Sequence, residues 1–391
     1  MDSYPTPSRF PKIAPFLGAA IVVLAACLPG NNLSVSRAPG EIVPMQERST
    51  PAPVLSPTGT QAKACTDIPE TFYDRGVRFF LLSDDQVQLW AGLEGETRLR
   101  VQYRFPDPIR ANVRFYPPGF PAISRDGYWV TVVENRKTGD NYIGCIELAA
   151  TEMVPLVNWR DSIYEAVISP DGTRVAFIAN EHEETHVYVM GSNTYNMKRL
   201  TQYSAPRCFL AWSPDSTRIT YQEECDPVSI SEIGPKVYVA ILDSSNNAKM
   251  MQLTGSGYAL SWSPDGEWLL WQPFPLYGGE YGPARLSRLN AAGEIVEEIA
   301  SGLGSRAGMW SPDSRKLAAI DGGNIVTWDI ESGAIVTTPL EIPDLVISAP
   351  TKWLCDGRLL FSGYRESSGY QSRRWFTVNA DGTHLIEYDA P

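Results

Sequence analysis

A short turn motif recurs along this chain at nearly constant spacing, and this recurrence limits the fold more than any other feature of the sequence. The motif resembles Ser-Pro-Asp-Gly, and its aspartates lie 45, 44, 50, 48 and 43 residues apart: Asp126, Asp171, Asp215, Asp265, Asp313 and Asp356. Proline presets φ in a tight turn, aspartate accepts hydrogen bonds from nearby backbone N–H groups, and glycine tolerates positive φ. Internal repeats of about 20–50 residues are the signature of repeat folds. We therefore expect one structural unit per repeat.

Each turn precedes a run of β-branched and aromatic residues that predicts a strand, for example residues 268–271. A second turn follows, as at 191–193, between an apolar run and a last short strand near 198–201. This pattern gives four antiparallel strands per repeat, which is the content of one β-propeller blade. Large flat side chains precede the motif in three repeats and are predicted to pack between blades rather than to bind a ligand: Trp212, Trp262 and Trp310.

The number of blades depends on the segment before the first motif. Residues 64–110 form one more repeat length with strand-like runs but without the motif. Counting this segment predicts an all-β fold, a β-propeller of seven four-stranded blades, and the alternative is six blades plus a capping segment. The ring would close either through N-terminal strands that join the last blade or through direct packing of the first and last blades.

The repeat also resembles a known family. Trp-Ser-Pro-Asp-Gly at 262–266, with a later Leu-Thr pair at 200–201 and 253–254, resembles the WD40-like (PD40) repeat of TolB-type propellers and of prolyl oligopeptidase propeller domains. The resemblance covers about residues 110–391 and implies the fold but no single function, because propellers support binding, gating and catalysis. TolB-type proteins carry much of their partner binding on a separate N-terminal α/β domain, and this sequence has a Pro- and Ser-rich segment in that place. The resemblance therefore does not imply a Tol–Pal role.

The N-terminal sequence is typical of a targeting segment. Arg9 and Lys12 precede an apolar stretch at 13–26, which is shorter than the roughly 20 residues that span a bilayer and fits a signal peptide at 1–26. Leu-Ala-Ala-Cys at 24–27 resembles the bacterial lipobox, which implies a diacylglycerol group on Cys27. The alternative is an ordinary signal peptide or a weak anchor with an incidental cysteine. Residues 27–63 are predicted to be the lipidated cysteine and a disordered tether, and 64–391 the propeller, outside the cytoplasm and anchored to the cell membrane.

Several functional classes are excluded by composition or by missing motifs. The 33 Lys and Arg residues against 45 Asp and Glu give a charge of −12, which repels nucleic acid. The chain has no G-x-S-x-G nucleophile elbow, phosphate loop or calcium loop. Residues 182–186 match the zincin pattern H-E-x-x-H, but they lie between two predicted strands, in a solvated hairpin loop. We therefore predict no catalytic residue, no metal and no cofactor, and we expect the turn aspartates to be structural.

The cysteines predict disulfide chemistry in an exported compartment. Besides Cys27, the chain contains Cys65, Cys145, Cys208, Cys225 and Cys355, an odd number that leaves at least one free thiol. Cys208 and Cys225 flank the strand–turn–strand around Asp215, and a disulfide across that hairpin is predicted.

The remaining candidates for function are loop insertions that differ between repeats. An aromatic, glycine-rich insertion at 273–282 carries Tyr277 and Tyr281, and a similar segment at 363–370 carries Tyr364 and Tyr370. We predict that these tyrosines contact a ligand or partner, and that the monomeric protein is a non-catalytic binding scaffold for an envelope protein, a peptide or a cell-wall glycan. Two alternatives stay open. One is a channel-centred enzyme of the lyase or glycosidase type, with residues from different blades, and the other is an accessory subunit of a membrane complex.

Overall fold

The computed structural model describes most of the repeat region. It covers residues 69–389 except 83–87, 105–108, 111–122, 135–140, 150–151, 160, 193–195, 203–206, 224–235, 254–256, 274–281, 305–307, 322, 341–344, 348–351 and 366–372. The predicted signal peptide, Cys27 and the predicted tether lie outside the described residues. No helix within these bounds has the length and the apolar character needed to cross a membrane.

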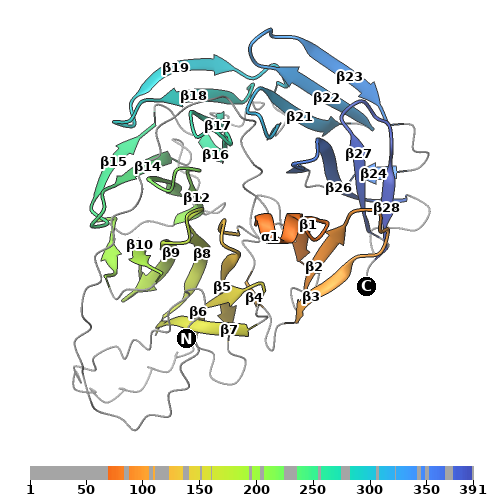
Figure 1. Ribbon diagram of the computed structural model, residues 1–391. Helices are drawn as coiled ribbons and strands as arrows, with labels where there is room; N and C mark the ends of the chain where they lie inside the picture. Colours follow the sequence, from red (N-terminus) through yellow and green to blue (C-terminus); the bar gives the residue numbers. More distant parts are fainter. Residues whose placement is uncertain are drawn as a thin grey trace, which may run out of the picture.

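Seven antiparallel sheets surround a common axis, which confirms the predicted seven-bladed β-propeller (Figure 1). The first sheet, blade 1, follows the short helix α1 (Glu70–Tyr73) and contains β1 (Val77–Leu82), β2 (Gln88–Leu93) and β3 (Arg100–Arg104). Blade 2 contains β4 (Ile109–Arg110), β5 (Tyr128–Glu134), β6 (Asn141–Glu147) and β7 (Glu152–Trp159). Blade 3 contains β8 (Ile163–Ile168), β9 (Arg174–Glu181), β10 (Glu184–Gly191) and β11 (Lys198–Arg199).

The later blades repeat this plan. Blade 4 contains β12 (Arg207–Trp212), β13 (Arg218–Glu223), β14 (Lys236–Leu242) and β15 (Ala248–Gln252). Blade 5 contains β16 (Gly257–Trp262), β17 (Trp268–Pro273), β18 (Arg285–Leu289) and β19 (Ile295–Ala300). Blade 6 contains β20 (Met309–Trp310), β21 (Lys316–Asp321), β22 (Asn324–Asp329) and β23 (Ile335–Pro339). Blade 7 contains β24 (Leu345–Ile347), β25 (Lys352–Trp353), β26 (Arg358–Arg365), β27 (Arg374–Asn379) and β28 (Ile386–Tyr388).

The sheets differ in strand number at the two ends of the ring. Blades 2–6 have four strands each, as predicted, whereas the described residues give blade 1 three strands. Blade 7 has five, because two separate segments, β24 and β25, both pair with β26. In each blade the first strand lies nearest the axis and the last lies at the rim (Figure 1).

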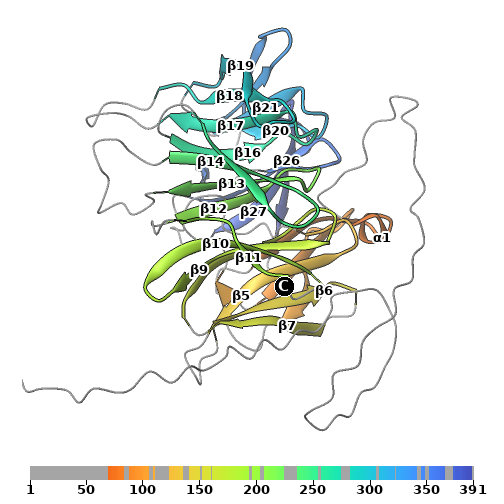
Figure 2. The ribbon, with the colours of Figure 1, turned by 90° about the vertical axis from the view of Figure 1, so that its left-hand side faces the viewer.

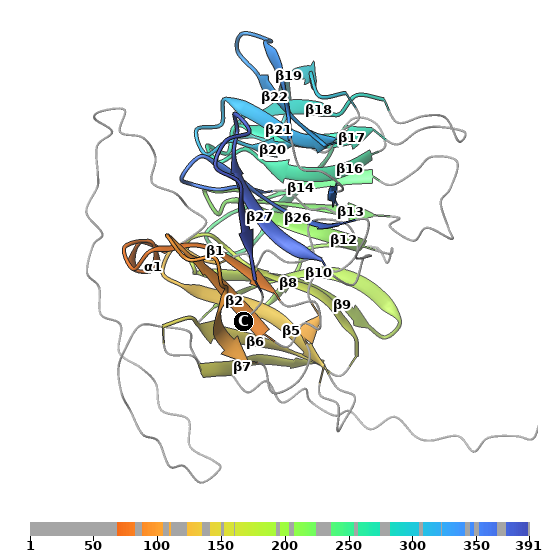
Figure 3. The ribbon, with the colours of Figure 1, turned by 90° about the vertical axis from the view of Figure 1, so that its right-hand side faces the viewer.

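The antiparallel order gives the ring two distinct faces. The turn face carries the Ser-Pro-Asp turns, which end the inner strands, together with α1. The loop face, on the opposite side, is where the second strand of each four-stranded blade ends and the third begins, together with the equivalent strand ends of blades 1 and 7. The helix α1 and the end of β17 lie on opposite sides of the ring (Figures 2 and 3).

The seams between blades are apolar, and the three motif tryptophans lie in them. Trp212 packs with Val167 and Ala176 of blade 3, Trp262 with Val237 and Val239 of blade 4, and Trp310 with Leu270 and Leu286 of blade 5. All three tryptophans are buried. The prediction that they pack between blades is confirmed.

The ring closes by direct packing of blade 7 against blade 1, which was one of the two predicted routes. Every strand of these two sheets comes from its own continuous segment of the chain. Phe79 and Leu81 of β1 pack with Trp375 and Tyr388 of blade 7, and the Phe79 and Tyr388 rings meet edge to face at 5.2 Å. One parallel bridge joins Arg98 to Asp389. The closing seam therefore depends mainly on side-chain packing.

Tyr388→Ala is expected to lower the free energy of unfolding by about 3 kcal/mol, because it removes an aromatic ring that is 2% exposed from the closing seam. The control is Ile335→Ala on β23, a residue 53% exposed, which should cost about 0.5 kcal/mol or less. Denaturant unfolding followed by tryptophan fluorescence measures both. Equal losses in the two variants would contradict this account of ring closure.

Candidate functional site

The Ser-Pro-Asp turns fold around their own aspartates. In five turns the serine hydroxyl donates to the aspartate two residues later: Ser124 to Asp126, Ser169 to Asp171, Ser213 to Asp215, Ser263 to Asp265 and Ser311 to Asp313. In four of them the same carboxylate accepts a backbone N–H two residues further on: Thr173, Thr217, Glu267 and Arg315. In the sixth turn Asp356 accepts from Arg358. The predicted structural role of these aspartates is confirmed.

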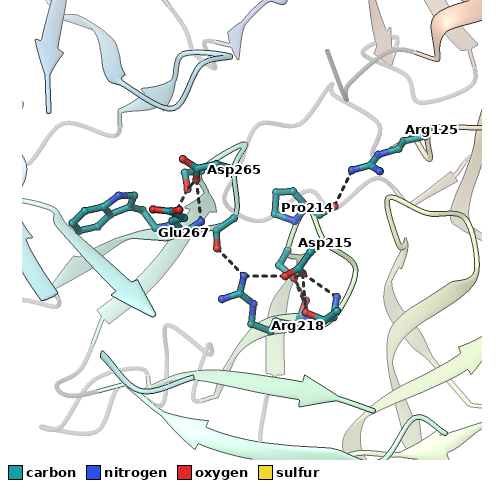
Figure 4. A network of polar contacts seen from close by, with 11 residues as sticks. Arg125, Pro214, Asp215, Arg218, Asp265 and Glu267 are labelled. Carbon is teal, nitrogen blue, oxygen red and sulfur yellow. Dashed lines mark hydrogen bonds and ion pairs between the residues drawn. The ribbon is translucent and has the colours of Figure 1, made fainter. Parts of the chain in front are cut away.

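These turns also bind one another around the turn face. The Arg125 N–H donates to the Pro170 carbonyl at 2.9 Å, and the Asp171 N–H donates to the Ser216 hydroxyl at 3.1 Å. The Arg218 guanidinium then donates to the Gly266 carbonyl at 2.7 Å, and the Asp265 N–H donates to the Ser314 hydroxyl at 3.0 Å. Hydrogen bonds therefore join the turns of blades 2 to 6 in series, and we call this set the turn chain. Figure 4 shows the part of it around Arg218.

Arg125 occupies the position where four of the other turns have proline. Its guanidinium donates to the Pro214 carbonyl at 3.2 Å and so reaches past blade 3 to blade 4 (Figure 4). The Arg125 N–H donates to the Pro170 carbonyl. Pro170 has no N–H, so it cannot donate to the Pro214 carbonyl in the same way. The Arg125 guanidinium therefore makes the hydrogen bond to the Pro214 carbonyl that the Pro170 backbone cannot make.

Arg218 is a cation enclosed in the seam between blades 4 and 5. It is 8% exposed, and its guanidinium lies 4.6 Å from the ring centroid of Trp262. The guanidinium also donates to Asp215 at 3.2 Å, in addition to Gly266 (Figure 4). A buried charge requires such partners. All of these contacts of Arg218 lie in the seam, so its role is to join blades 4 and 5.

Two of the turn carboxylates, Asp171 and Asp215, have lowered pKa values. Partial burial raises the pKa of Asp171, but hydrogen bonds from Ser169 and Thr173 and the nearby Arg174 outweigh it, and the pKa is lowered. The pKa of Asp215 is lowered by the corresponding contacts. Both groups are therefore ionised at neutral pH, and their oxygens are occupied by the turn.

Glu165 is a buried carboxylate that the sequence analysis did not single out. It lies in inner strand β8, is 7% exposed, and accepts the Leu210 N–H of neighbouring strand β12 at 2.8 Å. Burial raises its pKa to about 8, although the Leu210 and Phe209 N–H groups partly oppose this. Phe209 has φ of 61° at a register shift in β12, where the ladder with β13 is interrupted. Glu165 thus accepts the Phe209 and Leu210 N–H groups at the register shift of β12, in the next blade. No local sequence motif around Glu165 indicates this contact.

The pH dependence of stability should report on Glu165. Its folded pKa of about 8 exceeds its ordinary value of 4.5, so this group stabilises the fold fully below pH 4.5 and loses that contribution as pH rises to about 8. The loss is up to about 1.4 kcal/mol per pH unit. Glu165→Gln keeps an acceptor oxygen but cannot ionise, so the difference in unfolding free energy between wild type and variant should change across this range. A pH-independent difference would contradict the assignment.

One of the four predicted binding tyrosines, Tyr364, lies among the described residues. Tyr277 and Tyr281 fall between β17 and β18, and Tyr370 falls between β26 and β27; all three lie outside the described residues. The expectation that the segment 363–370 is a loop is wrong for Tyr364, which lies in β26 near its end, pairs with Val346 and is half-buried. The strands that flank these segments belong to blades 5 and 7, with blade 6 between them. The binding role of these residues stays a prediction.

The H-E-x-x-H segment forms a hairpin, as expected. His182 and Glu183 have φ of 53° and 69° and join β9 to β10 in a two-residue turn, with Glu181 paired to Glu184. The expectation that the whole segment is solvated is wrong for His186, which is fully buried and contacts Thr201 at 3.2 Å. The segment therefore lacks the helix that a zincin site requires. Across the part of the chain that is described, no three His, Cys, Asp or Glu side chains are grouped to hold a metal ion.

Two cysteines that the sequence analysis left unpaired are disulfide-bonded. Cys145, fully buried in β6, and Cys355, in the turn of blade 7, each belong to a disulfide. No cysteine among the described residues is free. The predicted Cys208–Cys225 bridge stays a prediction, because Cys225 lies outside the described residues.

Comparisons with known proteins agree with this architecture. No protein-family model matches the chain. A stretch of 102 residues is 30% identical to the Tol-Pal system protein TolB of Nitrosomonas europaea, over 25% of this chain and 23% of that protein. The chain is a β-propeller, and this stretch of it is similar to TolB. It spans about a quarter of the length of that curated relative.

A solved structure of another propeller supports the fold. The β-propeller domain of the Trilobed protease from Pyrococcus furiosus, described as having an open velcro topology, aligns with a TM-score of 0.51 and 14% identity, over 80% of this chain and 94% of that one. TolB from Acinetobacter baumannii aligns with a TM-score of 0.44 and 16% identity, over 68% and 64% of the two chains. At these identities the likeness concerns the fold alone.

Proposed function

We propose that this TolB-like propeller is a lipid-anchored protein outside the cytoplasm that binds an envelope protein, peptide or cell-wall glycan without catalysis. The observation that carries the proposal is the contrast between the two faces. The turn chain holds successive blades in fixed relation on one face. At the other face, a two-residue turn joins the second and third strands of blade 3, whereas the corresponding strands of blade 4, β13 and β14, are separated in sequence by residues 224–235. A rigid ring that presents unequal loops suits recognition.

The state of the described acids supports a non-catalytic role. The turn aspartates are engaged by their own turns, and two of them have lowered pKa values. Glu165 has a raised pKa but is enclosed between two blades and accepts backbone N–H groups. A general acid must reach its substrate, and this carboxyl is 7% exposed.

The chemistry of the cysteines supports a location outside the cytoplasm. Disulfides persist in oxidising compartments, and Cys145 and Cys355 are both in disulfides. This agrees with the signal peptide and lipobox that the sequence predicts at 1–27. The TolB relative is named for the Tol-Pal system, which favours a protein among the three classes of partner.

The lipid anchor is tested by Cys27→Ser in the full-length chain. We expect the wild type to enter the detergent phase of a Triton X-114 extraction and to incorporate labelled palmitate, because acyl chains would hold it in the membrane. The variant should move to the aqueous phase and lose the label. Identical behaviour of the two proteins would exclude lipidation at Cys27.

Binding through the loop face is tested by capture from detergent-solubilised envelope with the mature chain as bait. Tyr277→Ala/Tyr281→Ala should lose a stoichiometric partner or a glycan ligand, because aromatic side chains dominate such contacts. Ile335→Ala, on the exposed outer strand β23, is the control and should retain it. Equal capture by both variants would remove these tyrosines from the interface. A small ligand that binds without any partner would favour the channel-centred enzyme.

A further inference from the structure

The outer strand of blade 6, β23, exposes apolar side chains at the rim of the ring (Figure 1). Every residue from 331 to 337 is exposed, and among them Ile335 is 53% exposed and Val336 56%. Successive side chains of a strand point to opposite faces of its sheet. The exposure of these two neighbours therefore belongs to the strand itself and not to one face of blade 6.

β23 is also the one uncharged strand among the seven outer strands that the structure describes. Its sequence is Ile-Val-Thr-Thr-Pro. Each of the other outer strands carries at least one charged residue: Arg100 and Arg104 in β3, Glu152 in β7, Lys198 and Arg199 in β11, Lys249 in β15, Glu297 and Glu298 in β19, and Glu387 in β28. Charged side chains on an edge strand oppose its pairing with another chain. β23 lacks this protection.

The ladder with β22 determines which backbone groups of β23 point outward. The Leu340 N–H donates to the Gly323 carbonyl at 2.7 Å, and the Asp329 N–H donates to the Ala334 carbonyl at 2.9 Å. In this register the even-numbered residues from 334 to 340 bond to the β22 side. Alternate residues of an antiparallel strand bond to opposite neighbours. The N–H and C=O groups of Ile335 and Thr337 therefore point away from β22.

The accessible part of this edge is short. Pro339 belongs to the outward-pointing set, so its missing N–H removes no bond to β22 but ends any ladder on the outer side. A Cβ on Gly382, in the outer turn of blade 7, would stand 2.9 Å from Thr338 Cγ2 and 3.4 Å from the Pro339 carbonyl oxygen. Blade 7 thus covers this end of β23, and the accessible edge runs from Ala334 to Thr338.

We propose that β23 pairs antiparallel with β23 of a second copy of this chain, with the twofold axis at Val336. In this register Ile335 of one copy lies opposite Thr337 of the other, and each such pair exchanges both of its N–H···O bonds. The Val336 residues of the two copies face each other at a non-hydrogen-bonded position, where side chains are closest. The edge is thus its own complement, as an isologous contact requires.

The charge of the protein favours a second copy over a foreign strand. Each chain carries −12, so two copies repel each other unless the strands that meet are free of like charges. β23 meets this condition, whereas a basic partner segment would be attracted to β19, with Glu297 and Glu298. A ladder of five residues is small compared with a permanent interface, so we expect a weak, reversible dimer. The contact uses the rim of blade 6 and is independent of the proposed function.

Oxidative cross-linking of the full-length chain in whole cells tests the register. Val336→Cys places two thiols at a non-hydrogen-bonded pair, where the Cα atoms lie about 4.5 Å apart, within the roughly 4.4–6.8 Å that a disulfide spans. A mild oxidant should therefore produce a species of twice the mass on a non-reducing gel, which the wild type does not form. Val296→Cys, on β19, is the matched control because Val296 is also 56% exposed, and it should not form this species.

A proline on the outward side tests the hydrogen bonds. Thr337→Pro, introduced into the Val336→Cys chain, removes one outward N–H from each copy and none that bonds to β22. The loss of two hydrogen bonds should lower the yield of the doubled species about tenfold or more. Thr337→Ala keeps the N–H and should retain the yield, and thermal unfolding checks that both variants are folded.

Four results would overturn the proposal. Val336→Cys could form no doubled species, or Val296→Cys could form as much of it, which would indicate random collision; this comparison decides even if the proline variant fails to fold. A folded Thr337→Pro variant could retain the full yield, which would exclude the ladder. A cross-linked species of another mass would identify a different protein at this edge.

Discussion

Packing between neighbouring sheets is the interaction on which the rest of this structure depends. A sheet of three or four short strands cannot bury both of its faces alone, so each blade is stable only between two others. The seams are filled by aliphatic and aromatic side chains, with a tryptophan from the end of the inner strand in the seams that Trp212, Trp262 and Trp310 occupy. The aromatic contact between Phe79 and Tyr388 closes the circle. Packing alone does not depend on direction, whereas the hydrogen bonds of the turn chain do, because each turn is bonded to a defined group of the next turn.

The fold could be predicted from the sequence because its signal is local and repeated. Proline, aspartate and glycine act within their own turn, and the spacing of the turns alone indicates the blades. Two of the turns have serine instead of glycine at the fourth position of the motif, and the sequence analysis did not use this difference. Ser216 and Ser314 have φ of 62° and 64°, where glycine is more usual, and each uses its hydroxyl to accept a backbone N–H from the preceding blade.

The features that escaped prediction are those that join residues far apart in the sequence. Glu165 serves an irregularity that lies in another blade, and the register shift that creates it is not visible in the order of side chains. The disulfides of Cys145 and Cys355 depend on where distant strands and turns lie in space. Tyr364 was expected on a loop but lies in β26, because the strand continues to Arg365, and the sequence gives no turn signal that separates the end of this strand from the segment after it.

The arrival of the chain at blade 1 has a mechanical consequence. A force applied through the N-terminal segment would be transmitted first to Pro69 and α1, and from there to β1. Blades 2 to 6 are joined by the turn chain as well as by their seams, whereas blade 1 holds to blade 7 mainly through side-chain packing and the Arg98 bridge. Under load, blade 1 would therefore peel away first, and the five linked blades would remain together as the more resistant part of the ring.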